Sequence, residues 1–174
     1  MRLLGLDPGL RATGWGIVES DGARLSFVAC GTLRPHPDRD MAQRLAELHD
    51  GLAAMIAAHA PVEAAVEETF VNRNPASALK LGQARGVVLL APALAGLKVA
   101  EYHNKEVKKA VVGGGRAGKD QIGLMVRHLL PGCRPDSEDA ADALAVAICH
   151  AHHAGTQRRW AAADAAARVA AGRP

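Results

Sequence analysis

The first 32 residues constrain the fold most strongly, because they contain three short apolar segments with the composition of β-strands. These segments are 2–7, 14–20 and 25–32, and they are rich in Val, Ile, Leu, Trp and Phe. The second and third are joined through Asp21-Gly22, a dipeptide typical of tight hairpin turns. We therefore predict that the chain begins with an antiparallel meander of three strands.

The rest of the chain alternates between helical and strand patterns. Two further strands are predicted at 62–67 and 98–102. Helices are predicted after an Asp40 N-cap and before Pro61, and at about 76–91, 105–112, 119–130 and 138–153. This order indicates an α/β layer fold, in which sites form at strand ends. We expect one domain over residues 1–155, followed by a tail, 156–174, that is either a loosely docked helix or disordered.

Four carboxylates lie at the ends of predicted apolar strands or in the last predicted helix, where burying an acidic side chain costs free energy. Asp7 ends the first apolar segment, and Glu67 ends the segment 62–67. Asp139 and Asp142 are three residues apart in the last predicted helix, so they share one face. Such acids need a positive partner, and Mg²⁺ and Mn²⁺ prefer oxygen ligands. The set predicts a divalent-metal nuclease site, whereas the alternative is ordinary strand-end and helix-dipole charges.

Charge is distributed unevenly along the chain. Residues 1–70 hold 6 Lys or Arg against 10 Asp or Glu, whereas residues 71–174 hold 15 against 8. A basic second half suits a polyanionic partner such as nucleic acid, although solvated helix faces would give the same counts. The three cysteines lie in no C-x-x-C pattern. Asp7 stands where a signal peptide would need its apolar core, and the longest apolar stretch, 86–99, is broken by Pro92 and is shorter than a bilayer span. We expect a cytoplasmic protein that makes no contact with a membrane.

Four motifs resemble the RuvC family of Holliday-junction resolvases. They are DPGLRATGWG at 7–16, VEETF at 66–70, SALKLGQARG at 77–86 and DAADALA at 139–145. The third motif is the most specific of the four. Together they keep the order and spacing of the family over roughly residues 2–152.

The resemblance implies a ribonuclease-H-like fold, in which a three-strand antiparallel meander plus two parallel strands form a five-stranded mixed sheet flanked by helices. It also implies a homodimer, with helix 76–91 in the interface, that cuts two opposed strands of a four-way DNA junction during recombination and repair. The implied cofactor is Mg²⁺ or Mn²⁺, two ions per active site, and the implied partner is a branch-migration complex of the RuvA and RuvB type. Asp7, Glu67, Asp139 and Asp142 match the catalytic, metal-binding acids of the family. Strand alternation would turn Glu68 to the opposite face.

The resemblance further assigns roles to basic and aromatic side chains. Lys108 and Lys119 match catalytic lysines near the scissile phosphate, where an ammonium offsets transition-state charge. Phe70 matches an aromatic that stacks on an unpaired base at the junction centre, and the alternative is a ring folded onto the core. The further candidates for DNA contact are Arg73, Lys80, Arg85, Lys109 and Arg116. Each of these could instead be an ordinary solvated charge.

Three other patterns suggest different chemistry. The segment 113–119 nearly spells a phosphate-binding P-loop, but it follows a predicted helix and continues with Asp120 instead of Ser or Thr. A cluster of Cys and His at 149–153 could suggest zinc, but adjacent helical residues point about 100° apart. The loop after Asp7 resembles the phosphate loop of actin-like ATPases, which need two such domains. The rival hypotheses are therefore a non-catalytic junction-binding module and an actin-like ATPase fragment.

Overall fold

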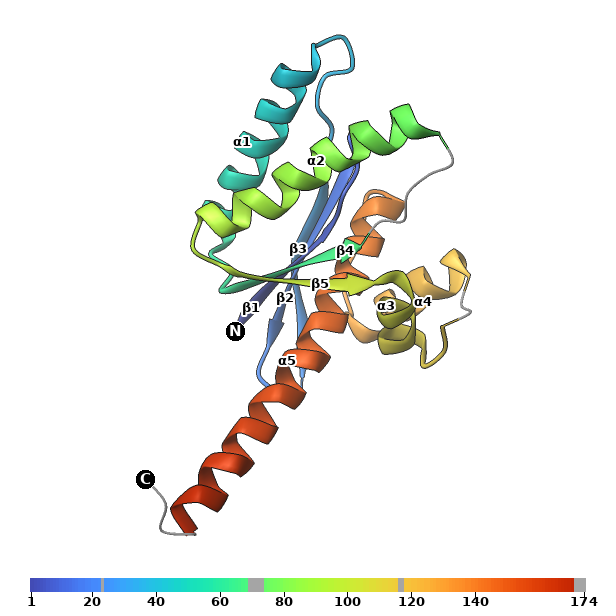
Figure 1. Cartoon of the computed structure of the whole chain (residues 1–174). Helices are drawn as coiled ribbons and strands as arrows, with labels where there is room; N and C mark the ends of the chain where they lie inside the picture. Colours follow the sequence, from blue (N-terminus) through green and yellow to red (C-terminus); the bar gives the residue numbers. More distant parts are fainter. Residues whose placement is uncertain (23, 69–73, 116–117, 171–174) are drawn as a thin grey trace.

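The computed structural model describes residues 1–22, 24–68, 74–115 and 118–170. These residues form one mixed sheet with helices on both faces (Figure 1). The strands are β1 (Arg2–Asp7), β2 (Thr13–Ser20), β3 (Leu25–Leu33), β4 (Glu63–Glu68) and β5 (Lys98–His103). The helices are α1 (Met41–His59), α2 (Pro75–Leu94), α3 (Asn104–Val112), α4 (Lys119–Leu129) and α5 (Glu138–Ala170). None of the described helices is both long and apolar enough to cross a membrane.

The sheet has the strand order β3-β2-β1-β4-β5. Strands β1, β2 and β3 pair in antiparallel fashion, and β4 pairs in parallel with both β1 and β5. This confirms the predicted three-strand meander followed by two parallel strands. The carboxyl ends of β1, β4 and β5 therefore meet at one edge of the sheet, where sites form in α/β folds.

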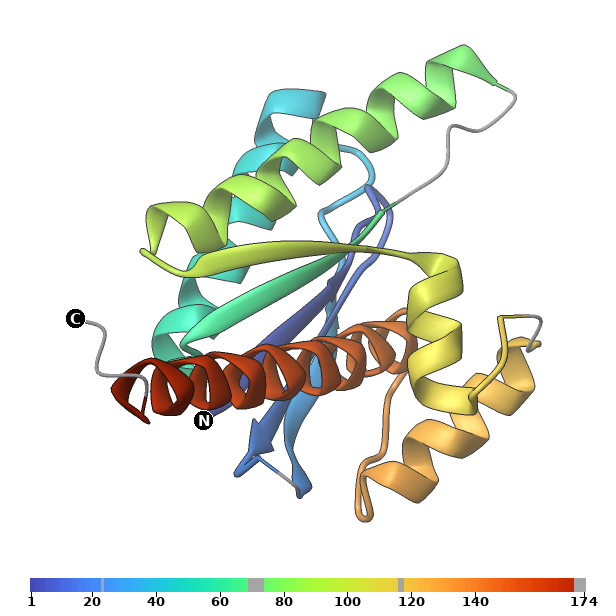
Figure 2. The ribbon, with the colours of Figure 1, turned by 60° about the horizontal axis from the view of Figure 1, so that its bottom comes forward.

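Strand alternation divides the core into two apolar clusters. Leu4 and Leu6 of β1 pack into a cluster with buried residues of α1 and α2, whereas Leu3 packs into a cluster with α3, α4 and α5. In Figure 2, α5 accordingly crosses the sheet on the side opposite α1 and α2. The two faces of β1 thus face different helix layers, as period-2 alternation requires.

Helix α5 approaches the sheet closely because two facing strand positions are glycine. A Cβ atom at Gly5 would lie 2.1 Å from the Ala143 carbonyl oxygen, and one at Gly14 would lie 1.9 Å from the Asp139 carbonyl oxygen. Real Cβ atoms do not tolerate such separations. The absence of a side chain therefore lets the backbone of α5 lie directly against β1 and β2.

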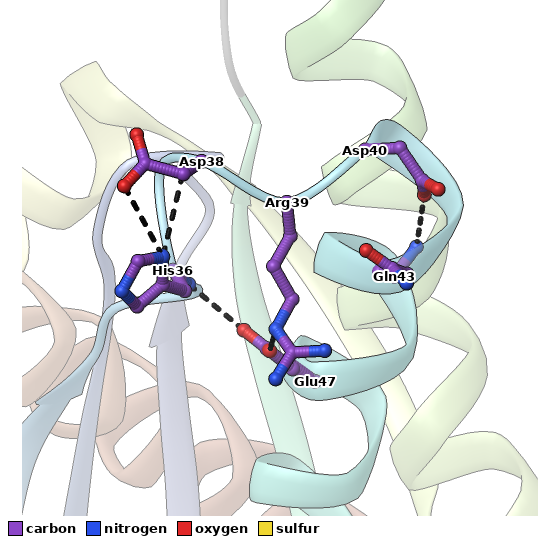
Figure 3. Close-up of polar contacts among 6 residues, drawn as sticks. All are labelled: His36, Asp38, Arg39, Asp40, Gln43 and Glu47. Atoms are coloured by element: carbon purple, nitrogen blue, oxygen red, sulfur yellow. Dashed lines mark hydrogen bonds and ion pairs between the residues drawn. The ribbon is translucent and has the colours of Figure 1, made fainter.

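The start of α1 confirms the predicted cap. The Asp40 carboxylate accepts a hydrogen bond from the backbone N–H of Gln43 at 2.8 Å. Figure 3 shows that Glu47 holds the preceding loop, accepting from the His36 backbone N–H at 2.8 Å and pairing with Arg39 at 2.6 Å. These contacts fix where α1 begins.

Two helices are longer than their sequence patterns predict. Helix α2 ends at Leu94 instead of about residue 91 and therefore contains Pro92. Pro92 removes one hydrogen bond of the helix, and the helix ends two residues after it. Helix α5 continues from His153 to Ala170 across the expected boundary at residue 155. Its final turns extend beyond the sheet (Figure 1). The Ala-rich composition of these turns favours continuation of the helix.

Candidate active site

The strand register places Asp7 beside Glu67. In the parallel pair of β1 and β4, Leu6 lies opposite Val66, and the two acids are the next residue of each strand. Neighbouring strands are about 4.8 Å apart, so the two side chains start close together at the carboxyl edge. Alternation along β1 turns Asp7 to the same face as Leu3, which packs toward α5. Both carboxylates are half-buried.

Helix α5 brings Asp139 to the same edge. Asp7 pairs across the sheet with Gly14, and Gly14 lies directly under the backbone of Asp139. The first turn of α5 is fixed by Ser137, whose hydroxyl accepts from the Ala140 backbone N–H at 3.0 Å. Asp139 is therefore positioned by a capped helix terminus that is packed on the strand next to Asp7.

Asp142 lies one turn further along α5 and borders a different hollow. It lines a cavity of about 290 Å³ between α4 and α5, together with Asp120 and Arg127. Asp139 instead lines a groove of about 630 Å³ beside the loop that follows β1. The two acids thus border different hollows.

Asn104 forms a hydrogen bond with Glu67. Its side-chain amide donates a hydrogen bond to the Glu67 carboxylate from the first residue of α3. Lys108 is four residues later and half-buried, so it lies on the same face of α3 as Asn104. The next acid, Glu68, forms an ion pair with His103 instead, in agreement with its predicted turn to the opposite face.

The donor set is suited to a hard divalent cation, because the predicted ligands are all carboxylates. Among the described residues, however, no three His, Cys, Asp or Glu side chains lie close enough together to hold a metal ion. Asp7 and Asp142 each have another interaction partner. The structure therefore gathers the backbones of the acids without arranging their oxygens as a coordination sphere, and their role as metal ligands stays a prediction.

The predicted DNA-contacting residues have different surroundings. Lys80 of α2 is exposed and lines the same groove as Asp139. Arg85 forms an ion pair with Glu101 of β5, and a DNA phosphate would have to compete with that carboxylate. Lys109 lines a separate pocket between α3 and α5.

Several predicted residues cannot be placed. Lys119 is the first residue of α4, and its side chain lies outside the described part of the chain. Phe70, Arg73 and Arg116 also lie outside the described residues. Their predicted roles therefore stay predictions.

Two of the three sequence patterns that suggested other chemistry, the segment 113–119 and the cluster 149–153, lie away from the carboxyl ends of β1 and β4 in sequence. The P-loop-like segment joins α3 to α4, so no strand precedes it. In the cluster at 149–153, burial raises the pKa of the Cys149 thiol to about 12. His150 is buried against Tyr102 and Glu63, with its Nδ1 atom 3.0 Å from the tyrosine oxygen. His152 is exposed and lines the pocket between α3 and α5.

Sequence reasoning missed three residues at this edge. Asn104 has no motif of its own, and only its position after β5 places it near Glu67. Arg11 belongs to the first motif but had no assigned role, and it lines the groove with Lys80 and Asp139. Arg44 lies in α1, far from every motif in sequence, and reaches the same groove.

Comparisons with known proteins identify a family. The profile described as "Crossover junction endodeoxyribonuclease RuvC" matches residues 3–150. A protein of that name from Azorhizobium caulinodans is 66% identical over 155 residues, which cover 89% of this chain and 92% of the relative. Another from Rhodospirillum rubrum is 62% identical over 173 residues, covering 99% and 100%. The solved structure of Thermus thermophilus RuvC in complex with a Holliday junction substrate has a TM-score of 0.84 and 34% identity, and the match covers 90% of this chain and 96% of that one.

Proposed function

The chain belongs to the RuvC family of crossover junction endodeoxyribonucleases, and on this basis we propose that it resolves four-way DNA junctions by hydrolysing two opposed phosphodiesters. The observation that carries the proposal is the shared position of Asp7, Glu67 and Asp139. The register of β1 with β4 and the contact of α5 with Gly14 bring these acids to one edge. Such a cluster next to a basic groove suits the hydrolysis of a phosphate diester.

We propose that Asp7, Glu67, Asp139 and Asp142 hold two Mg²⁺ or Mn²⁺ ions, as the family resemblance implies. Divalent ions at such a site activate water and stabilise the leaving oxygen. Rotation of the acidic side chains, without a change of fold, would bring the oxygens together. Asn104 orients Glu67 by donating a hydrogen bond to it, which is the role of outer-shell partners at metal sites.

The lysines of the site supply positive charge. Lys108 is half-buried on the face of α3 that carries Asn104, so its ammonium would act in a region that is partly shielded from water. There it would offset negative charge that develops on the phosphate. Lys119 and Phe70 retain the roles that the resemblance implies, phosphate approach and base stacking.

Two symmetric cuts require two sites, and we propose a homodimer formed through α2. Three leucines of this helix, Leu79, Leu90 and Leu94, are 67%, 52% and 68% exposed. Their spacing of 11 and 4 residues places them along one side of the helix. Leu90→Asp should yield monomers in analytical ultracentrifugation, and Leu124→Asp, on the exposed face of α4, is the matched control. A wild-type monomer at micromolar concentration would contradict the dimer.

The setting of this activity is also a proposal. We place the protein in the cytoplasm, working with a branch-migration complex of the RuvA and RuvB type. An odd number of cysteines and membership of the family support this setting.

The test of the function is the substitution Asp7→Asn. It should abolish cutting of a synthetic four-way junction in Mg²⁺ or Mn²⁺ while junction binding persists. Asp50→Asn, which alters an exposed acid on α1, serves as control and should cut normally. Full activity of Asp7→Asn would refute the assignment. Junction binding by the wild-type protein without any cutting would instead favour the non-catalytic binding module.

A further inference from the structure

The groove beside Asp139 is strongly cationic. It lies between the loop that follows β1 and the first turns of α2. Its charged lining consists of three cations, Arg11, Arg44 and Lys80, and one acid, Asp139. An anion that enters the groove would therefore meet an excess of positive charge within reach of the active-site edge.

Arg44 differs from Arg11 and Lys80, which are both exposed. It lies in the first turns of α1 and is half-buried, and its Nη2 atom donates to the Leu10 carbonyl oxygen at 2.9 Å. Its Nε atom is buried and has no hydrogen-bond partner. Within the described part of the chain, no carboxylate pairs with this guanidinium. A partly desolvated guanidinium that lines a groove and has no acidic partner among the described residues favours an anionic ligand.

Arg39 and Arg85 differ from Arg44 because each pairs with a carboxylate of the chain. Arg39, at the start of α1, pairs with Glu47 at 2.6 Å (Figure 3). Arg85, on α2, pairs with Glu101. These guanidiniums are neutralised by carboxylates of the chain itself. Arg44, by contrast, has no acidic partner among the described residues.

The loop that follows β1 carries Arg11, forms one wall of the groove and is tightly folded. The buried Thr13 hydroxyl donates to the Gly9 carbonyl oxygen at 2.6 Å, and a Cβ atom at Gly9 would lie 2.1 Å from the Ala12 carbonyl oxygen. Arg44 ties the same loop to α1 through Leu10. Because the loop is held at both ends, the groove is preorganised, and ligand binding would cost little conformational entropy.

We propose that this groove binds a backbone phosphate next to the cleaved linkage, with Arg44 as its principal ligand and Arg11 and Lys80 flanking it. The ligand is a phosphodiester of the cut strand, so the inference rests on the proposed function and adds to it a site and two arginines. Arg44 would hold the strand in register with Asp139. It would also couple the DNA strand to the loop that follows Asp7.

The first test measures the salt dependence of binding. In an Asp7→Asn background, which prevents cutting, binding of a fluorescent four-way junction is followed between about 50 and 200 mM salt. Arg44→Gln should lower the slope of log K against log[salt] by about 0.9 for each phosphate that the variant no longer neutralises. Arg39→Gln is the matched control and should keep the wild-type slope. A purely structural Arg44 would weaken binding without changing the slope, and that result would overturn the proposal.

The second test locates the phosphate. Single methylphosphonate linkages, which are uncharged, are placed in turn near the cleavage point. One position should weaken binding of the Asp7→Asn protein by about tenfold, the size of a charge-assisted hydrogen bond. The same linkage should cause no further loss of affinity in the Asp7→Asn protein that also carries Arg44→Gln. Equal losses of affinity with and without Arg44 would refute the assignment.

A final variant keeps the proposal testable if Arg44→Gln folds poorly. Arg11→Gln alters an exposed side chain of the same groove and leaves the hydrogen bond between Arg44 and Leu10 intact. It should also lower the salt slope, and an unchanged slope would count against the site. If the wild-type protein cuts no junction, the proposed function fails. If it cuts junctions while the variants show the wild-type slope of log K against log[salt], only the assignment of the groove fails.

Discussion

Replacing Gly14 with alanine should separate Asp139 from Asp7. The new Cβ atom would lie 1.9 Å from the Asp139 carbonyl oxygen and 2.3 Å from its carbonyl carbon. A carbon and an oxygen in contact need about 3.3 Å, so the first turn of α5 must retreat by roughly 1.4 Å. Both of the close atoms belong to the backbone, and no rotation of a side chain can relieve the clash.

The retreat should reduce cleavage more than binding. A misplacement of about 1 Å in a catalytic constellation can cost on the order of 100-fold in rate. Overpacking should also destabilise the protein by about 1–3 kcal/mol, which lowers the melting temperature by roughly 2–4 °C per kcal/mol for a chain of this size. Single-turnover cleavage of a four-way junction gives the rate, and thermal denaturation gives the stability.

The matched control is Gly155→Ala in α5, about four turns beyond Asp139. There a Cβ atom would meet only the Gly22 carbonyl oxygen, at 3.8 Å. This change should leave cleavage unaffected and stabilise the fold by about 0.4–1 kcal/mol, the usual gain from replacing a glycine in a helix. If Gly14→Ala cuts junctions at the wild-type rate, then packing on β2 does not position Asp139.

Two further predictions concern Asn104 and Cys149. Asn104→Ala removes the donor to Glu67 and should weaken the apparent affinity for Mn²⁺, measured from the metal dependence of cleavage, by about 10–100-fold; an unchanged affinity would contradict the orienting role. Burial raises the pKa of Cys149 from 9.0 to about 12, so its contribution to stability is complete below pH 9 and is lost as the pH rises toward 12. Between pH 9 and pH 12, the free energy of unfolding from denaturant titrations should therefore fall less for Cys149→Ala than for the wild type. If it falls equally in both proteins, the thiol is not buried.

Local signals were sufficient to predict most of the elements. The hairpin at Asp21-Gly22 and the cap at Asp40 are encoded in short stretches of sequence, and the strands end within one residue of the prediction. The meander plus two parallel strands is confirmed as well. The predicted ends of α2 and α5, at about residues 91 and 153, were wrong, because α2 continues through Pro92 to Leu94 and α5 continues to Ala170. The sequence left the region after residue 155 open between a docked helix and disorder, and an Ala-rich composition favours a helix without deciding between the two.

The positions of the acids could be predicted only in part. Strand ends suggested Asp7 and Glu67, and the register of β1 with β4 shows that they are neighbours. By contrast, the groove depends on tertiary contacts. Nothing in the sequence near Arg44 indicates that it reaches the Leu10 carbonyl oxygen of a loop 34 residues away. Asn104, the first residue of α3, was missed for the same reason, because its partner Glu67 lies on β4.

The glycines explain how the fold brings an acid of α5 to the strand edge. Gly5 lies on β1 and Gly14 on β2, and both lie under the backbone of α5. A side chain at either position would hold the helix further from the sheet, and Asp139 would move away from Asp7. The backbone positions of Asp7 and Asp139 are thus fixed by packing. On the proposal that the four acids hold divalent ions, metal binding at this edge should therefore reorient the half-buried carboxylates while the helix and sheet stay in place.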